Sequence, residues 1–236
     1  MWFLCSPQLV AADMDERYLR NLSALSEGEC RLLRSKRVLV VGCGGLGGYI
    51  IEMLSRLGVG AIRLVDGDRF EETNLNRQLL SAPELLGVSK AVVAMSRINK
   101  VNPDVRAEAH CTWLDENNAE ELVSGCDIVL DALDNIGSRR ILADACEKQG
   151  VPFVYGAISG WVAQAAISMP GDDFVDKLFP RDVEIKDKSA LSFTPALCAA
   201  MQCALATRLL CGREIKSSSL KYFDLLNMEF ETIDMV

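Results

Sequence analysis

Histidine is almost absent from this chain, with His110 the only one among 236 residues. Its nine cysteines include no C-x-x-C pair; they stand at positions 5, 30, 43, 111, 126, 146, 198, 203 and 211. Structural zinc sites need Cys and His ligands at short spacing, so we expect no zinc. Most of these cysteines lie in apolar segments, where a thiol acts as a small hydrophobic side chain. This usage predicts a reducing, cytoplasmic location without disulfides.

Long hydrophobic runs and an excess of basic residues are also missing. No uninterrupted apolar stretch reaches the ~18 residues of a membrane span, and residues 1–10 lack the basic start of a signal peptide. We therefore expect no membrane association. Lys and Arg number 25 against 33 Asp and Glu, a net charge of −8. This balance argues against nucleic acid as a partner, because phosphate binding needs a basic surface.

A glycine-rich turn follows the apolar run Val38–Val41, which is typical of a strand buried on both faces. We assign five turn positions to nucleotide binding: Gly42, Gly44, Gly45, Leu46 and Gly47. Three of them fit G-x-G-x-x-G, which combines a tight turn, a close phosphate approach and tight helix packing. The helix predicted over 46–57 points free N–H groups at any bound anion. Asp66 ends a second apolar run, 61–65, where such a unit places a carboxylate for ribose hydroxyls.

Polar side chains after the second predicted strand indicate a more highly charged ligand than NAD. Asn74, Arg77 and Lys90 add an amide and two cations. The pyrophosphate of a dinucleotide is held largely by a helix end, whereas a triphosphate needs cations and usually a metal. A nucleoside triphosphate is therefore favoured over a dinucleotide.

Strands alternate with helices as far as residue 158, and then the pattern changes. The alternation predicts a Rossmann-like α/β fold, with a mainly parallel sheet covered by helices on both faces. The strand expected over 161–169 has no helix before it, so antiparallel strands continue the sheet on the C-terminal side. We expect one domain over 1–236, which has four parts: N-terminal helices 9–35, a nucleotide-binding part 36–158, an irregular crossover loop 170–192, and a helix plus hairpin 193–236.

The chain resembles the ubiquitin-activating-enzyme-like adenylyltransferases of the ThiF/MoeB/HesA type. Five features carry the resemblance in order: the glycine turn, Asp66-x-Asp68, Asn74-x-x-Arg77-Gln78, Gly87-x-x-Lys90 and Asp131-x-x-Asp134-Asn135. It covers nearly the whole chain and implies a homodimer with an eight-stranded sheet. It also implies a reaction in which ATP adenylates the C-terminal glycine carboxylate of a small ubiquitin-like sulfur-carrier protein ending in Gly-Gly. Pyrophosphate is the second product.

The same resemblance implies a role for each site residue, with ATP and Mg²⁺ as cofactors. Arg77 and Lys90 would stabilise charge on the β- and γ-phosphates, and Asp134 would coordinate Mg²⁺. Arg20 would complete the site from the partner subunit. The remaining implied binding residues are Asp66 at the ribose, Asn74 near the α-phosphate, and Asp68, Gln78 and Asn135 beside them.

Two departures from the family pattern narrow the expected chemistry. Many relatives carry two C-x-x-C pairs for zinc, and this chain is a short member without them. Some relatives place a reactive cysteine in the crossover loop, but none lies between Cys146 and Cys198. We therefore expect an enzyme whose work stops at the adenylate.

Three other interpretations stay open at this point. The first is a relative that activates another carboxylate or amide, of the tRNA threonylcarbamoyladenosine dehydratase type. The second is a catalytically silent, nucleotide-binding dimer partner, which the intact set of charged residues disfavours. The third is an NAD oxidoreductase, which would not require Lys90 or Asp134.

Overall fold

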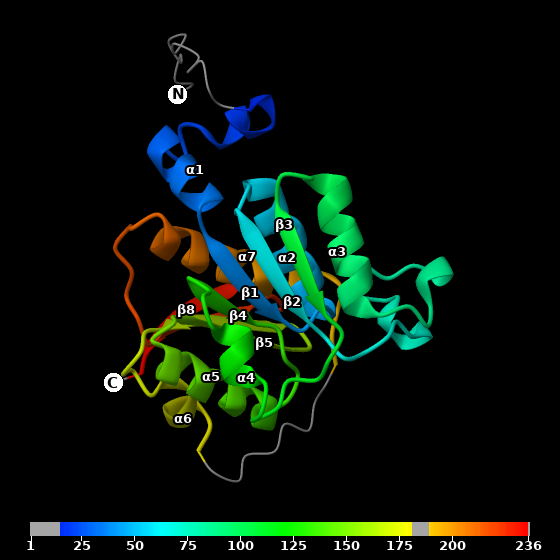
Figure 1. Ribbon diagram of the computed structural model, residues 1–236. Coiled ribbons are helices and arrows are strands. Elements are labelled where there is room, and N and C mark those ends of the chain that lie inside the picture. Colours follow the sequence, from blue (N-terminus) through cyan, green and yellow to red (C-terminus); the bar gives the residue numbers. More distant parts are fainter. Residues whose placement is uncertain (1–14, 181–188, 236) are drawn as a thin grey trace.

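The predicted strands form one eight-stranded sheet in the order β3-β2-β1-β4-β5-β6-β7-β8 (Figure 1). The computed structural model describes residues 15–180 and 189–235. The strands are β1 Arg37–Val41, β2 Ala61–Val65, β3 Arg106–His110, β4 Ile128–Asp131, β5 Phe153–Ser159, β6 Val162–Ser168, β7 Ser219–Asp224 and β8 Glu229–Asp234. Strands β1 to β5 pair in parallel, and β5 to β8 pair antiparallel. The fold class expected from the sequence is therefore confirmed.

Helices pack on both faces of this sheet. They are α1 Glu27–Arg34, α2 Gly45–Leu57, α3 Lys90–Val101, α4 Ala119–Val123, α5 Ile136–Gln149, α6 Phe174–Leu178 and α7 Phe193–Leu210, with 3₁₀ turns η1 Glu16–Asn21, η2 Glu72–Asn74 and η3 Pro83–Leu85. One core cluster joins the sheet to α1, α2, α3 and α7, and the other joins it to α4, α5 and α6. Successive residues of β1 alternate between the two clusters, because side chains of a strand point to opposite faces.

The N-terminal helical region is broken before α1, where the pattern Ser26-Glu27-Gly28-Glu29 predicts that one helix stops and another starts. Residues 16–21 form only the 3₁₀ turn η1, and α1 starts after Ser26. The Ser26 hydroxyl accepts from the Glu29 backbone N–H, and Glu29 accepts from the Ser26 N–H, so a capping box starts the helix. Residues 9–14 of the predicted region lie outside the described part of the chain.

The crossover segment differs from its prediction. Instead of being irregular throughout, it contains α6, whose Phe174 and Val175 are buried against the core. Residues 181–188 of the predicted loop lie outside the described residues. Because two apolar side chains of this short helix find a buried face, tertiary packing overrides the polar composition of the segment.

The C-terminal helix and hairpin follow as predicted, with the β7–β8 turn at residues 225–228. By length and composition α7 could cross a membrane, but half of its 18-residue window is buried inside the protein. Core helices pass the same test, so this is weak evidence for a membrane span.

Candidate active site

The site lies at the carboxyl ends of β1 and β4, where the order of the sheet reverses. The chain runs from β1 outward through β2 and β3, then returns to place β4 on the other side of β1. Ligands of open α/β sheets bind in the crevice at such a switch point. Gly42 turns the chain away from β1 with φ of 96°, and a Cβ there would lie 2.5 Å from the Ala132 carbonyl oxygen.

Close packing of α2 on this turn depends on the third glycine of the motif. A Cβ on Gly47 would lie 1.8 Å from the carbonyl oxygen of Gly42. Gly47 therefore lets the first turn of α2 sit directly on the glycine turn. It acts through this packing and does not line the cavity.

A cavity of about 340 Å³ opens at this crevice and brings most predicted site residues together. Those that line it are Gly42, Gly44, Gly45, Leu46, Asp66, Asp68, Arg77, Gln78, Lys90, Asp134 and Asn135. Gly47, Asn74 and Arg20 lie outside it. Residues from the segments 42–46, 66–90 and 134–135, which are separate in the sequence, thus surround one cavity.

The N-terminus of α2 offers its backbone donors to this cavity. No described side chain caps the helix at Gly44. The Gln78 amide lies against Gly44, 3.4 Å from where a Cβ would be. Gln78 is 8% exposed, and its Oε1 atom has no hydrogen-bond partner among the described residues. A buried acceptor without a donor is costly, so a ligand hydroxyl or amino group fits this position.

Asp66, Asp68 and Lys90 form a chain of charges along one wall. Asp66 accepts from the Cys43 N–H at 2.7 Å and from the Asp68 N–H at 2.8 Å, which ties the glycine turn to the end of β2. Lys90, at the start of α3, is 6% exposed, and its Nζ lies 2.5 Å from Asp68 Oδ2. Partial burial is the largest single effect on Asp68 and opposes its ionisation. The hydrogen bonds from Lys90 and the Arg69 N–H, together with the charge of Lys90, outweigh it and lower the pKa of this carboxyl below its ordinary value.

The side chains of Arg77 and Asn74 differ in where they point. Arg77 lines the cavity and donates from Nη1 to the Thr73 carbonyl and to Asn76 Oδ1, both at 2.8 Å. Asn74 is buried, and its Oδ1 accepts from the Glu71 N–H at 3.1 Å. In this structure Asn74 therefore shapes the 71–78 loop, and the predicted contact with a phosphate stays a prediction.

Asp134 and Asn135 lie between β4 and α5 on the opposite wall. Asn135 caps α5 through a bond from the Ser138 N–H to its Oδ1 at 2.8 Å. Among the described residues, no group of three or more His, Cys, Asp or Glu side chains could hold a metal. Mg²⁺ is usually held by one or two carboxylates together with substrate phosphates and water, so a single Asp134 at a phosphate cavity fits that ion.

Arg20 lies at the opposite edge of the sheet from the cavity. Its turn η1 is held there by Asn102, which accepts from Arg17 Nη1 and donates to the Tyr18 hydroxyl, both at 2.6 Å. Asn102 ends α3, and Tyr18 packs on Gly58 at the end of α2. Both helices begin at the cavity edge, so their C-terminal ends mark the far edge. Arg20 is exposed there and cannot reach the cavity of its own chain.

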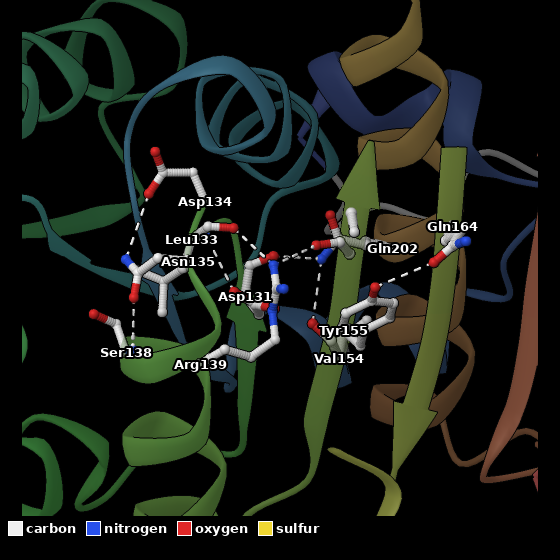
Figure 2. A network of polar contacts seen from close by, with 12 residues as sticks. Asp131, Leu133, Asp134, Asn135, Ser138, Arg139, Val154, Tyr155, Gln164 and Gln202 are labelled. Atoms are coloured by element: carbon white, nitrogen blue, oxygen red, sulfur yellow. Dashed lines mark hydrogen bonds and ion pairs between the residues drawn. The ribbon is translucent and has the colours of Figure 1, made fainter. Parts of the chain in front are cut away.

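Sequence reasoning missed a buried ion pair beneath the loop of Asp134. Arg139 Nε lies 2.5 Å from Asp131 Oδ2, and Gln202 donates to the Asp131 carbonyl at 2.8 Å (Figure 2). Burial alone would lower the pKa of Arg139, but the Asp131 carboxylate raises it above its ordinary value. Complete burial raises the pKa of Asp131, and Arg139 with the Leu133 N–H limits the rise. The sequence feature that could have predicted this ion pair is an arginine eight residues after an aspartate.

Trp113 is a second residue that sequence reasoning missed. It lines the cavity at its rim, is 67% exposed, and lies so close to Gly67 that a Cβ there would be 2.7 Å from the ring. A single exposed aromatic residue is ordinary on a protein surface, but here the ring lies at the rim of a cavity, where its face can contact a ligand. The signal available was a lone aromatic residue three positions after a strand that ends at the ligand edge.

The described cysteines do not provide a nucleophile in the cavity. Burial raises the pKa of both Cys198 and Cys203 to about 12, so both remain protonated thiols at neutral pH. Cys43 is fully buried inside the glycine turn, and burial raises its pKa well above the ordinary value. Cys111, the exposed cysteine of the described residues, does not line the cavity.

The sheet order, the glycine turn and the charged cavity define a Rossmann-like α/β protein with a crevice of the nucleotide-binding type. The chain belongs to the ThiF family, whose model matches residues 17–235. It is 36% identical over 228 residues to the "SAMP-activating enzyme E1" of Haloferax volcanii, covering 92% of this chain and 84% of the relative.

Other relatives match over a smaller share of their own length. The "Sulfur carrier protein adenylyltransferase" of Thermus thermophilus is 43% identical over 141 residues, covering 60% of this chain and 52% of that relative. Among solved structures, E. coli MccB with ATP superposes with a TM-score of 0.81 at 20% identity, over 94% of this chain and 72% of that one. PaaA gives 0.79 at 18% identity, over 98% and 78%. These structures support the fold.

Proposed function

We propose that this protein is an ATP-dependent adenylyltransferase that activates the C-terminal glycine carboxylate of a small ubiquitin-like sulfur-carrier protein. The family assignment supports an enzyme of this type, and two relatives are named for activating SAMP or for adenylating a sulfur carrier protein. The names of these two relatives favour this function over the dehydratase alternative.

One observation carries the chemical assignment: a nearly buried lysine and an aspartate face the same cavity as an uncapped helix N-terminus. Lys90 is 6% exposed, and Asp134 lies on the opposite wall. Removing a cation from water costs free energy unless an anion pairs with it. Asp68 pairs with Lys90 here, and the phosphates of ATP would be a second anionic partner.

The reaction needs charge neutralisation more than acid–base catalysis. A carboxylate oxygen of the carrier forms a bond to the α-phosphorus of ATP, while the bond from that phosphorus to the bridging oxygen breaks and pyrophosphate leaves. The attacking carboxylate is already ionised at neutral pH, so no general base is required. Lys90 and Arg77 would stabilise the charge that accumulates on the leaving pyrophosphate.

Asp134 would hold Mg²⁺, which when bound neutralises the phosphates and orients them. Asp66 would bind the ribose and Gln78 Oε1 would accept a ligand proton. Trp113 has the right position and chemistry to stack on the adenine base. Because Arg20 cannot enter its own cavity, the proposal requires a homodimer in which Arg20 of the partner subunit completes the site. A cytoplasmic location belongs to the same proposal.

Pyrophosphate exchange into ATP tests the function directly. We expect purified protein to exchange labelled pyrophosphate into ATP when a carrier ending in Gly-Gly is supplied, and a carrier lacking these two residues is the control. Asp134→Ala should abolish exchange and keep the circular dichroism spectrum of the folded protein. Near wild-type exchange in that variant would defeat the Mg²⁺ assignment. ATP binding without exchange under any condition would instead support a silent dimer partner.

A further inference from the structure

Directly beneath the Asp134 loop lies an ion pair that the adenylation chemistry does not itself use. Asp131 ends β4, and Arg139 lies about one turn inside α5. Their exposed fractions are 0% and 1%, and Arg139 Nε lies 2.5 Å from Asp131 Oδ2. Both charges are thus removed from water and paired with each other.

Both members of the pair also hold the backbone of Leu133, the residue before Asp134 (Figure 2). The Leu133 N–H donates to Asp131 Oδ1 at 2.9 Å, and the Leu133 carbonyl accepts from Arg139 Nη2 at 2.7 Å. The two backbone polar groups of Leu133 are therefore held by opposite charges. Little freedom remains for the backbone that leads into Asp134.

The pair is in turn attached to the rest of the sheet. Pairing between β4 and β5 ends at Leu130 and Val154, so the two strands separate at Asp131. Gln202 of α7 enters this gap from one face and donates to the carbonyls of Asp131 and Val154, at 2.8 and 3.2 Å. Arg139 enters from the other face and donates to the Gly156 carbonyl at 3.2 Å. These hydrogen bonds connect the base of the Asp134 loop to β5 and α7.

Stability alone is a weak reason for such an arrangement. Desolvating two charges offsets most of their attraction, and well-packed apolar residues often replace a buried pair without loss. Arginine does have a property that an apolar residue or a lysine lacks: a rigid fork of donors. Here the fork reaches three different acceptors, on Asp131, Leu133 and Gly156. That pattern is suited to fixing a position.

We propose that Asp131 and Arg139 are positioning residues for Asp134. They hold its carboxylate where it can coordinate Mg²⁺ bound to the triphosphate. The inference rests on the proposed function. Arg139 also lines the floor of the cavity, but it is 1% exposed and its donors are taken up by Asp131, Leu133 and Gly156. Replacement of Arg139 would then weaken metal-dependent nucleotide binding more than metal-free binding. Groups that hold a metal ligand in place typically affect metal affinity by about 10- to 100-fold.

Titration calorimetry of ATP, once with Mg²⁺ and once with EDTA, tests this on the full chain without needing turnover. In Arg139→Lys the ion pair with Asp131 can persist, but the bonds to Leu133 and Gly156 are lost. We expect the gain in ATP affinity that Mg²⁺ provides to fall roughly tenfold, while affinity in EDTA changes less than twofold. Arg140→Lys is the matched control, because Arg140 is the next residue of α5 and binds Asp176 and the Phe179 carbonyl instead.

A double-variant cycle separates positioning from general damage. If Arg139 acts through Asp134, then Arg139→Lys adds nothing in an Asp134→Asn background, since coupled residues are non-additive. A full Mg²⁺ gain in Arg139→Lys, or an equal further loss in the double variant, would overturn the inference. If Arg139→Lys does not fold, Asp131→Asn/Arg139→Gln leaves no unpaired buried charge and carries the same test.

Failure of the proposed function would look different. If Asp134→Asn itself keeps the whole Mg²⁺ gain, the metal role of Asp134 is lost and the proposed function is undermined. If Asp134→Asn loses the gain while Arg139→Lys keeps it, only the positioning role is wrong. The two failures are therefore distinguishable in one set of titrations.

Discussion

At the scale of single residues, Lys90 combines two demands that usually conflict. Its ammonium group is almost entirely removed from water, yet it has to meet a ligand. Asp68 makes this possible, because that carboxylate lies 2.5 Å away while its own side chain remains 41% exposed. In the absence of nucleotide the ammonium group is thus paired with a carboxylate that water can still reach. Asp66 then fixes Asp68 through its backbone N–H.

Lys90→Met removes the charge and keeps most of the volume. We expect pyrophosphate exchange to fall by about 100-fold or more, because a donor aimed at developing charge in a water-poor site contributes on that scale. Exchange is measured with saturating carrier, and circular dichroism checks the fold. Lys148→Met is the control, because Lys148 forms an exposed ion pair with Glu120 away from the cavity. Equal exchange in the two variants would rule out a catalytic role for Lys90.

At the scale of elements, the start of α1 is held by one carboxylate. Glu29 accepts from the Ser26 N–H in the capping box and also pairs with Arg213, which follows α7. The hydrogen bond from Arg213, followed by that from Ser26, lowers the pKa of Glu29 to about 2. A helix of eight residues is thereby tied to the segment that leads into the C-terminal hairpin.

The lowered pKa of Glu29 predicts the pH range in which its contacts with Arg213 and Ser26 stabilise the protein. Its folded-state value lies below the ordinary 4.5, so its stabilising effect is present above pH 4.5 and is lost as pH falls towards 2. Glu29→Gln should therefore lower Tm at pH 7, and the difference from wild type should shrink between pH 4.5 and 2. Thermal melts across this range check it. Glu27→Gln is the control, since Glu27 makes only an exposed pair with Arg31 on the same helix. A Tm difference independent of pH would contradict the assignment.

At the scale of the whole molecule, the placement of Arg20 bears on how many chains the proposed site needs. The contacts of Arg17 and Tyr18 with Asn102 hold η1 at the edge of the sheet away from the cavity. If Arg20 takes part in the proposed reaction, it must therefore act from a second copy. Closed twofold dimers are the commonest assembly in which each copy gives the same residue to the other.

Mixing two inactive variants tests the exchange of Arg20. We expect Arg20→Ala and Asp134→Ala each to be inactive alone. After denaturation and co-refolding, mixed dimers contain one site with both native residues, so about a quarter of wild-type activity should return if assembly is random. Mixing Lys90→Met with Asp134→Ala, both on one chain's side of the site, gives the reference. Absence of recovery with Arg20→Ala, in dimers shown to be mixed, would contradict a role across the interface.

Local sequence patterns predicted most of the architecture. Apolar runs, the glycine turn and the Ser26 capping signal depend on neighbouring residues, so strands, the turn and the α1 start agree with prediction within a few residues. The glycine positions 42 and 47 also follow from backbone sterics alone. The charge-rich crossover segment was predicted less well, because burial of Phe174 and Val175 depends on a face built elsewhere in the chain.

By itself, then, the sequence determined the sheet-and-helix order and the residue types gathered for a phosphate ligand. Only the tertiary structure decided that Asn74 points into its own loop, that Arg20 lies at the far edge, and that Asp131, Arg139 and Gln202 meet beneath Asp134. These outcomes depend on contacts between segments as much as 85 residues apart. Strand order and helix packing select such contacts, and neither is visible in the spacing of the residues along the chain.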